Sequence, residues 1–156
     1  MVIGGAALAL LGVVNRQTRD CDILHPELSD AIRAAAAELV AKVRREGGDL
    51  APDRLNHGPL SLADLLPAGW KHRLQPAFSG RALTLHALAR LDLLRSKLLA
   101  RCDRGLDLPD CVALAPTSGE LDEILPWLER QDPNPGWPVH VRDTLDDLWQ
   151  RLSRGV

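Results

Sequence analysis

The amino-acid sequence predicts an α/β fold, with a small mixed sheet flanked by helices and a helical C-terminal half. Every segment with a strand-like pattern precedes residue 87, and only helical patterns follow it. Alanine and leucine are abundant, whereas the chain has no tyrosine and one phenylalanine, a composition that favours helices over an extensive sheet. The 156 residues suit a single domain, with a sheet-bearing part over about residues 1–86 and a helical part over 87–156.

Composition and charge exclude several classes of protein. With 46% hydrophobic and 26% charged residues, the chain is neither disordered nor embedded in a membrane. The net charge of -2 argues against a generally basic coat for nucleic acids. The three cysteines are far apart and contain no C-x-x-C pair, which predicts a reducing, cytoplasmic environment. The apolar segment 1–14 is too short to span a bilayer and lacks the basic start of a signal peptide, so we expect it in the core.

The first part of the chain predicts two short strands around a compact helix. Residues 1–3 form an apolar run, which Gly4 and Gly5 end. Residues 6–12 then predict a helix that closes at a glycine. A second strand is expected over about residues 18–24, where polar and apolar side chains alternate.

Asp20 and Asp22 carry the chemistry that this segment offers. At a spacing of two residues on a strand, their carboxylates share one face. Mg²⁺ prefers oxygen ligands and is usually held by one or two carboxylates together with substrate phosphates, where it neutralises a leaving pyrophosphate. The turn at Gly4 and Gly5 opens a helix, so it offers backbone N–H groups that a phosphate can approach closely. Taken alone, each feature is more often a plain surface pair or turn.

The rest of the sheet-bearing part follows from periodicity and from glycine and proline. The pattern predicts a helix over residues 26–46 with an apolar stripe along one side. Residues 49–69 are expected to form a long loop with one short turn at 62–66. Two strands, 72–78 and 81–86, are expected to form a hairpin.

The helical part is marked by clearer signals. Residues 88–104 predict the strongest helix, and a short helix is expected over 108–114. Thr117 and Glu120 form a capping box for a further helix, which Pro126 is expected to kink or split, and a terminal amphipathic helix completes the chain. The strongest helix has a second, basic face, formed by Arg90, Lys97, Arg101 and Arg104. The four tryptophans are expected to pack rather than to stack on bases: Trp70, Trp127, Trp137 and Trp149.

The features of the first strand, helix and second strand form one continuous pattern. It begins Val2-Ile3-Gly4-Gly5-Ala6-Ala7-Leu8 and continues, after the helix, as Arg16-Gln17-Thr18-Arg19-Asp20-Cys21-Asp22. A hydrophobic strand, G-G or G-S, a short helix and then R-x-T-x-D-x-D is the first motif of bacterial nucleotidyltransferases of the AbiEii toxin type. The chain resembles this family, which lies within the DNA polymerase beta-like nucleotidyltransferase superfamily.

A second pattern lies in the strongest helix and directly after it. Lys97 and Arg104 precede Asp107-Leu108-Pro109-Asp110. This pattern is similar to the later motif of the same family, in which a lysine and an arginine precede R-D-x-x-D. Leu106 stands where the family has the second arginine. Weaker likeness extends to residues 56–59 and to the region of Trp137.

The resemblance implies transfer of a nucleoside monophosphate from an NTP, with Mg²⁺, to a hydroxyl of an RNA (a tRNA) or of a protein. It further implies a toxin–antitoxin or phage-defence component, with an antitoxin protein as partner. The implied catalytic residues are Asp20, Asp22, Lys97 and Asp110, and the implied metal ligands are Asp20 and Asp22. The implied nucleotide-binding residues are Gly4, Gly5, Thr18, Arg104 and Asp107. A third carboxylate is open among Asp92, Asp107 and Asp110.

Two other functions stay open beside this one. The chain could bind nucleotides without turnover, or it could be a non-catalytic protein whose basic helix docks an acidic partner. Metal-dependent NTP binding separates the first two functions from the third, and transfer of a labelled nucleotide separates the first from the second. The sequence selects neither the NTP nor the acceptor.

Overall fold

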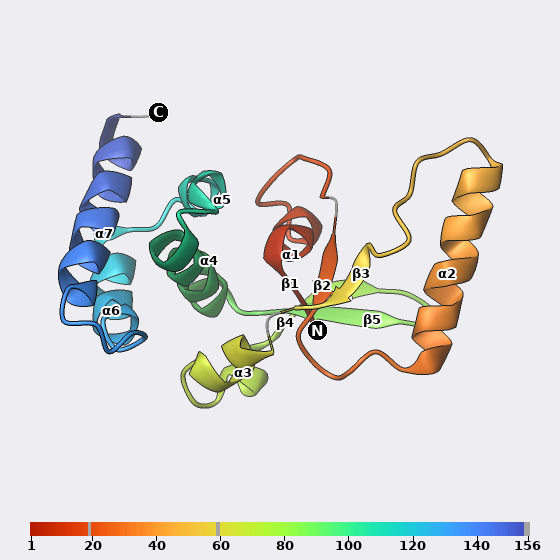
Figure 1. Cartoon of the computed structure of the whole chain (residues 1–156), viewed down its shortest axis with the longest axis horizontal. Coiled ribbons are helices and arrows are strands. Elements are labelled where there is room, and N and C mark those ends of the chain that lie inside the picture. The colour runs from red at the N-terminus through yellow and green to blue at the C-terminus, as the bar shows by residue number, and fades with distance from the viewer. Residues whose placement is uncertain (19, 59, 155–156) are drawn as a thin grey trace. The chain divides into compact units, whose positions relative to one another are not determined.

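The computed structural model describes residues 1–18, 20–58 and 60–154. Arg19 of the first motif and Pro59 of the weaker likeness lie outside the described residues. The chain divides into two compact units, Met1–Asp64 with Lys71–Leu88 (unit 1) and Leu65–Trp70 with Ala89–Val156 (unit 2). The predicted α/β class is confirmed, because a five-stranded mixed sheet precedes a helical C-terminal half (Figure 1).

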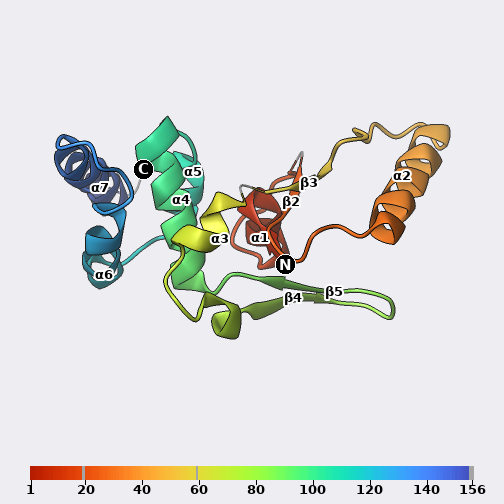
Figure 2. The same ribbon diagram turned by 60° about the horizontal axis from the view of Figure 1, so that its bottom comes forward.

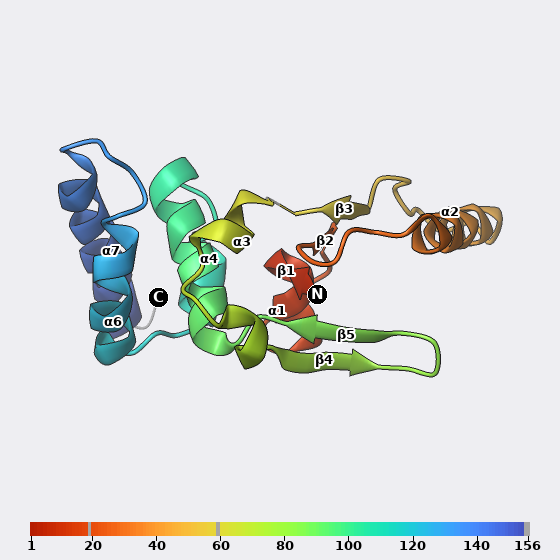
Figure 3. The same cartoon turned by 90° about the horizontal axis from the view of Figure 1, so that it is seen from below.

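Unit 1 is built on a sheet with the strand order β3-β2-β1-β5-β4. Its strands are β1 (Val2–Ile3), β2 (Cys21–Ile23), β3 (Leu55–His57), β4 (Gln75–Ser79) and β5 (Thr84–Ala87). β1 pairs antiparallel with β2 and parallel with β5, and β2 pairs parallel with β3. β4 and β5 form the predicted hairpin at one edge (Figure 3).

The centre of the sheet is the core of unit 1. Val2 of β1 and Ala87 of β5 are register partners, and both are completely buried. The helix α1 (Gly4–Leu10) follows β1 without an intervening residue and buries Ala6, Ala7 and Leu8. The expectation that the apolar start lies in the core is therefore confirmed for residues 2–8, whereas Leu10 is 42% exposed.

Three elements of unit 1 differ from the prediction. β2 has three residues rather than the seven expected over 18–24, so Asp20 precedes the strand. The predicted loop contains a strand, β3. The sequence does not indicate it, because three residues are too few to show an alternating pattern. The predicted turn at 62–66 is a short helix, α3 (Ser61–Leu65), and a 3₁₀ turn (Trp70–Arg73) precedes β4.

The helix predicted over 26–46 is confirmed as α2 (Asp30–Arg45). It begins four residues later than predicted, and Ser29 is its N-cap, whose Oγ accepts a hydrogen bond of 3.4 Å from the backbone N–H of Ile32. Val40 is the one buried residue among its 16, so most of its surface meets solvent. Figure 2 shows α2 joined to β2 and β3 by two extended segments and lying apart from the strands.

Unit 2 is helical, with α4 (Arg90–Arg104), α5 (Leu108–Ala113), α6 (Ser118–Leu128) and α7 (Trp137–Arg154). Fully buried leucine and isoleucine side chains on α4, α6 and α7 form its core: Leu94, Leu98, Ile124, Leu128 and Leu148. The capping box of Thr117 and Glu120 is confirmed. Pro126 does not split the helix into two pieces, because α6 continues through it and ends two residues later. The expected kink stays a prediction.

The tryptophans of unit 2 divide into packed and exposed side chains. Trp70 and Trp127 are buried, and the Nε1–H of Trp127 donates to the Leu65 carbonyl oxygen at 2.9 Å. Trp149 is 42% exposed, so the expectation that it packs is wrong. No helix within the described residues is both long enough and apolar enough to cross a membrane.

Candidate functional site

The turn between β1 and α1 lies directly against the segment that carries the predicted carboxylates. Gly4 has a φ of +68°, a conformation that glycine adopts at little cost. A Cβ atom at Gly4 would lie 3.1 Å from Oδ2 of Asp22, and one at Gly5 would lie 3.2 Å from Oγ1 of Thr18. The two glycines therefore let Thr18 and Asp22 approach the turn as closely as they do.

The pairing of β1 with β2 explains this proximity. Ile3, the last residue of β1, is the register partner of Asp22, so the turn that follows Ile3 begins beside Asp22. Asp22 is half-buried and Asp20 is exposed. The Thr18 hydroxyl donates to the Asp20 backbone carbonyl at 2.9 Å, directly before β2. Binding of a metal ion by the two carboxylates stays a prediction.

Cys21 stands between the two predicted metal ligands in the sequence and begins β2. Burial raises the pKa of the Cys21 thiol, and the neighbouring Asp22 carboxylate raises it further. The thiol therefore stays protonated at neutral pH, and Asp20 and Asp22 supply carboxylate oxygens on either side of it in the sequence. Hard cations such as Mg²⁺ prefer oxygen ligands.

Asn56, in β3, is a further candidate that lies outside the two main motifs. It is the register partner of Asp22 in the parallel pair of β2 and β3, and partners in such a pair lie on the same face of the sheet. Gly58 follows two residues later. A Cβ atom added there would lie 2.7 Å from Cδ1 of Ile3 and 3.4 Å from Cβ of Asp22. Glycine at 58 therefore keeps the end of β3 close to Asp22, and the Asn56 amide supplies one more neutral oxygen on that face. The weaker likeness at residues 56–59 is the only signal in the sequence that could have indicated it.

In unit 2, the structure brings together three of the predicted site residues. Nζ of Lys97 lies 2.7 Å from Oδ2 of Asp110 and 3.2 Å from Oδ2 of Asp107. The side chains of Lys97 and Asp110 are 7% and 2% exposed, whereas that of Asp107 is 30% exposed. One ammonium group and two carboxylates thus form a cluster that is almost closed to solvent.

The local structure after α4 forms this cluster. Gly105 ends α4 with a φ of +69°, and Asp107 adopts a left-handed conformation with a φ of 63°. The chain then re-enters a helix at once, which places Asp110 in the first turn of α5. Burial raises the pKa of the Cys111 thiol to about 12, and the nearby Asp107 carboxylate contributes to that increase.

The predicted basic face of the strongest helix is therefore wrong in one respect. Lys97 is buried, and its charge is compensated by Asp107 and Asp110. Arg104 stays at the surface, with Nε 3.6 Å from Oδ2 of Asp103, and does not join the cluster. Roles of Lys97 and Arg104 in nucleotide binding stay predictions.

Asp92, the third candidate for a further carboxylate, belongs to a structural network. It is completely buried, and its Oδ1 accepts from Nη1 of Arg95 at 2.9 Å. Nη2 of Arg95 reaches Oε1 of Glu123 on α6 at 3.0 Å, so this network joins α4 to α6. Within residues 1–18, 20–58 and 60–154, no three His, Cys, Asp or Glu side chains gather closely enough to hold a metal ion.

One family model covers both the glycine turn with Asp20 and Asp22 and the cluster around Lys97. The family model "Nucleotidyltransferase of unknown function" (DUF6036) matches residues 1–112, from β1 to the Asp110 turn. The chain belongs to this family. Neither a curated protein nor a solved structure matches it. Membership assigns this DUF6036 protein to nucleotidyl transfer in general, and the match supports the nucleotidyltransferase superfamily without selecting the AbiEii type.

Proposed function

We propose that this DUF6036 nucleotidyltransferase moves a nucleoside monophosphate from an NTP to a hydroxyl group of an RNA, such as a tRNA, or of a protein. The observation that carries the proposal is the contact between the glycine turn and Asp22, where a Cβ at Gly4 would come within 3.1 Å of the carboxylate. A backbone without side chains beside a carboxylate is the arrangement that a metal-bound triphosphate needs. Both motifs lie within the matched residues.

Oxygen atoms of Asp20, Asp22 and Asn56 form the donor set that fits Mg²⁺ in this proposal. Two carboxylates and one amide suit a hard cation that takes its remaining ligands from water and substrate phosphates. When bound, Mg²⁺ supplies neutralisation of the phosphate charge that develops during transfer. The chain's own contribution is to hold Asp22 beside the turn, through the register of Ile3 with Asp22.

A toxin–antitoxin or phage-defence role of the AbiEii type, in the cytoplasm and with an antitoxin protein as partner, belongs to the same proposal. Its support is the resemblance of the two motifs, which covers Gly4-Gly5, the Asp20 and Asp22 pair, and the segment from Lys97 to Asp110. The departure at Leu106 removes one arginine from the later motif, so fewer side chains of this chain contact phosphates than in the family pattern.

The proposed activity is tested by transfer of label from each of the four α-labelled NTPs. The protein is incubated with Mg²⁺ and total cellular RNA, or with a cytosolic extract freed of RNA, and macromolecules are separated from free nucleotide. We expect label on one of the two acceptor classes, and no label when the cation is chelated. Saturable binding of an NTP without transfer to either acceptor class would instead identify a nucleotide-binding protein without turnover.

Asn56→Asp is expected to strengthen Mg²⁺ binding by roughly tenfold or more, because a unit charge is added beside the Asp22 carboxylate. Isothermal titration with Mg²⁺, with and without NTP, measures the change. Asn134→Asp is the matched control, since Asn134 is an exposed loop residue of unit 2 whose side-chain oxygen accepts from the Gly136 N–H. Equal affinities of the wild-type protein and Asn56→Asp would remove Asn56 from the donor set.

A further inference from the structure

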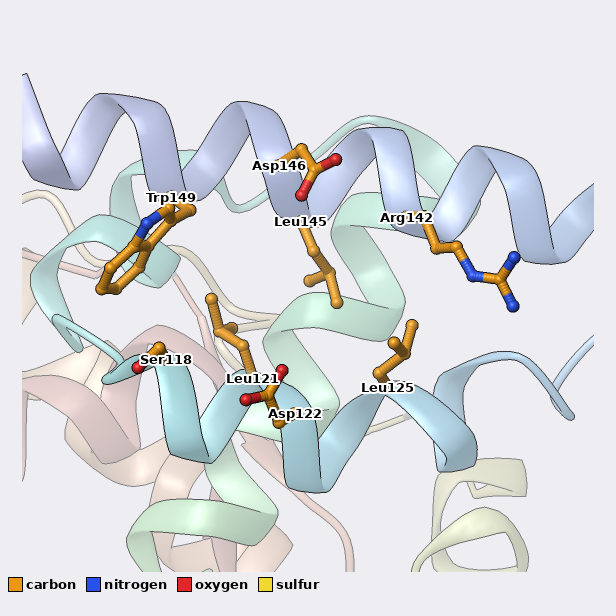
Figure 4. A pocket seen from close by; sticks show the side chains of 8 residues that line it. All are labelled: Ser118, Leu121, Asp122, Leu125, Arg142, Leu145, Asp146 and Trp149. Atoms are coloured by element: carbon orange, nitrogen blue, oxygen red, sulfur yellow. The ribbon is translucent and has the colours of Figure 1, made fainter.

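The helices α6 and α7 enclose an open groove on the surface of unit 2. We define the α6–α7 groove by Leu121, Asp122, Leu125, Leu145, Asp146 and Trp149 (Figure 4). The volume of this groove is about 260 Å³. A neighbouring hollow of about 400 Å³ shares Ser118 and Trp149 with it and also contacts Leu152. Trp149 is 42% exposed although it is the largest apolar side chain of the groove. The indole of Trp149 thus lies partly in water above a floor of leucine side chains and leaves apolar surface that a docked segment can cover.

The rim of the groove is acidic. Asp122 and Asp146 are both exposed, and neither forms an ion pair with any described residue. The cation at the groove, Arg142, is already engaged, with Nη2 2.6 Å from Oε1 of Glu129. The apolar floor and two uncompensated carboxylates therefore favour an apolar segment that also carries positive charge.

A segment with that chemistry is present in the chain itself. α2 exposes Ile32 and Leu39, which are 40% and 55% exposed and lie two turns apart on its apolar stripe. Alanines at 35 and 36 stand between them, which lets another backbone approach closely. The last turn of α2 carries three cations, Lys42, Arg44 and Arg45.

α2 also lacks the packing that a helix of its length needs. Most helical stability in proteins comes from a packed apolar face rather than from the intrinsic propensity of the residues. Of the 16 residues of α2, only Val40 is buried. The exposed stripe therefore needs a surface that covers it.

We propose that a second copy of this chain docks its α2 along the α6–α7 groove. Ile32 and Leu39 contact Leu121, Leu125 and Trp149 of the other copy, and the basic last turn faces Asp122 and Asp146. Exchange in both directions closes the pair into a symmetric dimer with two equal interfaces. This inference is independent of the proposed transferase activity, because it uses no residue of the candidate site.

Sedimentation velocity of the full chain over a range of concentrations tests the proposal. We expect a reversible dimer whose dissociation constant rises at least roughly tenfold in Leu39→Glu and in Leu125→Glu, because each variant places a charge in a packed apolar contact. Asp122→Lys, at an exposed position that the fold does not require, should weaken the dimer in the same direction. Leu83→Glu is the matched control, since Leu83 is an equally exposed leucine (46%) on neither surface.

Mixing the two apolar variants identifies the pair of surfaces. Leu39→Glu keeps an intact groove and Leu125→Glu keeps an intact α2, so their mixture should form heterodimers more tightly than either variant dimerises alone. A wild-type protein that stays monomeric at all concentrations would overturn the proposal. Dimerisation that survives both Leu125→Glu and Asp122→Lys would overturn it as well, because α2 would then be covered by another surface.

Discussion

Replacing Asp20 and Asp22 together by asparagine is expected to abolish metal-dependent NTP binding and to lower nucleotidyl transfer by more than about 100-fold. Loss of a residue that only orients a metal ligand already costs about 10–100-fold, and this variant removes two proposed ligands. The double variant should remain folded, since Asp20 is exposed and Asp22 is only half-buried. Titration with NTP in the presence and absence of Mg²⁺, followed by the label-transfer assay, measures both effects.

The matched control for that experiment is Asp49→Asn with Asp53→Asn. These carboxylates are exposed, belong to the same unit, and lie in the segment between α2 and β3. The control changes the net charge by the same amount, so it separates loss of a specific site from loss of general attraction for Mg²⁺. Unchanged Mg²⁺-dependent NTP affinity in the Asp20 and Asp22 double variant would show that the metal is held elsewhere.

The second large effect concerns stability. Lys97→Met is expected to lower the free energy of unfolding by about 3–5 kcal/mol, because it leaves the buried Asp110 carboxylate without its cation. For a protein of this size, that loss corresponds to a fall in Tm of about 6–20 °C. Thermal unfolding followed by circular dichroism measures it. Adding Asp110→Leu to Lys97→Met should restore most of the stability, since an apolar pair can replace a buried ion pair of similar volume.

Arg104→Met provides the comparison for a surface ion pair. Nε of Arg104 lies 3.6 Å from Oδ2 of Asp103, and both side chains are more than half exposed. Exposed pairs contribute about 0–1 kcal/mol, so this variant should unfold close to the wild-type temperature. If Lys97→Met also keeps the wild-type Tm while NTP binding weakens, Lys97 acts on a phosphate rather than on the fold.

Local signals in the sequence predict the parts of this molecule that depend on neighbouring residues. The Thr117 and Glu120 capping box is formed by side chains three residues apart, and the sequence predicts it correctly. The glycine turn is also local, and so is the end of α4 at Gly105. Such features need no knowledge of tertiary contacts.

Features that depend on distant pairing are not predictable in the same way. β3 has three residues and exists because it pairs with β2, more than 30 residues earlier in the chain, so its own pattern does not reveal it or Asn56. The burial of Lys97 depends on the left-handed conformation of Asp107, which turns the chain back over α4. Helical periodicity places Lys97 on a polar face and contains no information on that turn.

The position of β1 determines the order in which unit 1 folds. β1 is flanked by β2 and β5, and Val2 pairs with Ala87, the last residue of β5. β1 is therefore synthesised well before β5, its partner strand, and most of unit 1 lies between them in the chain. Closing such a long loop makes formation of the sheet slow, and the apolar residues of β1 and α1 stay accessible to chaperones until β5 has been synthesised. The described residues of unit 2 contain no strand, and its helices α4 to α7 follow one another along the chain. Contacts among these four helices close shorter loops than the pairing of β1 with β5, so they should form faster.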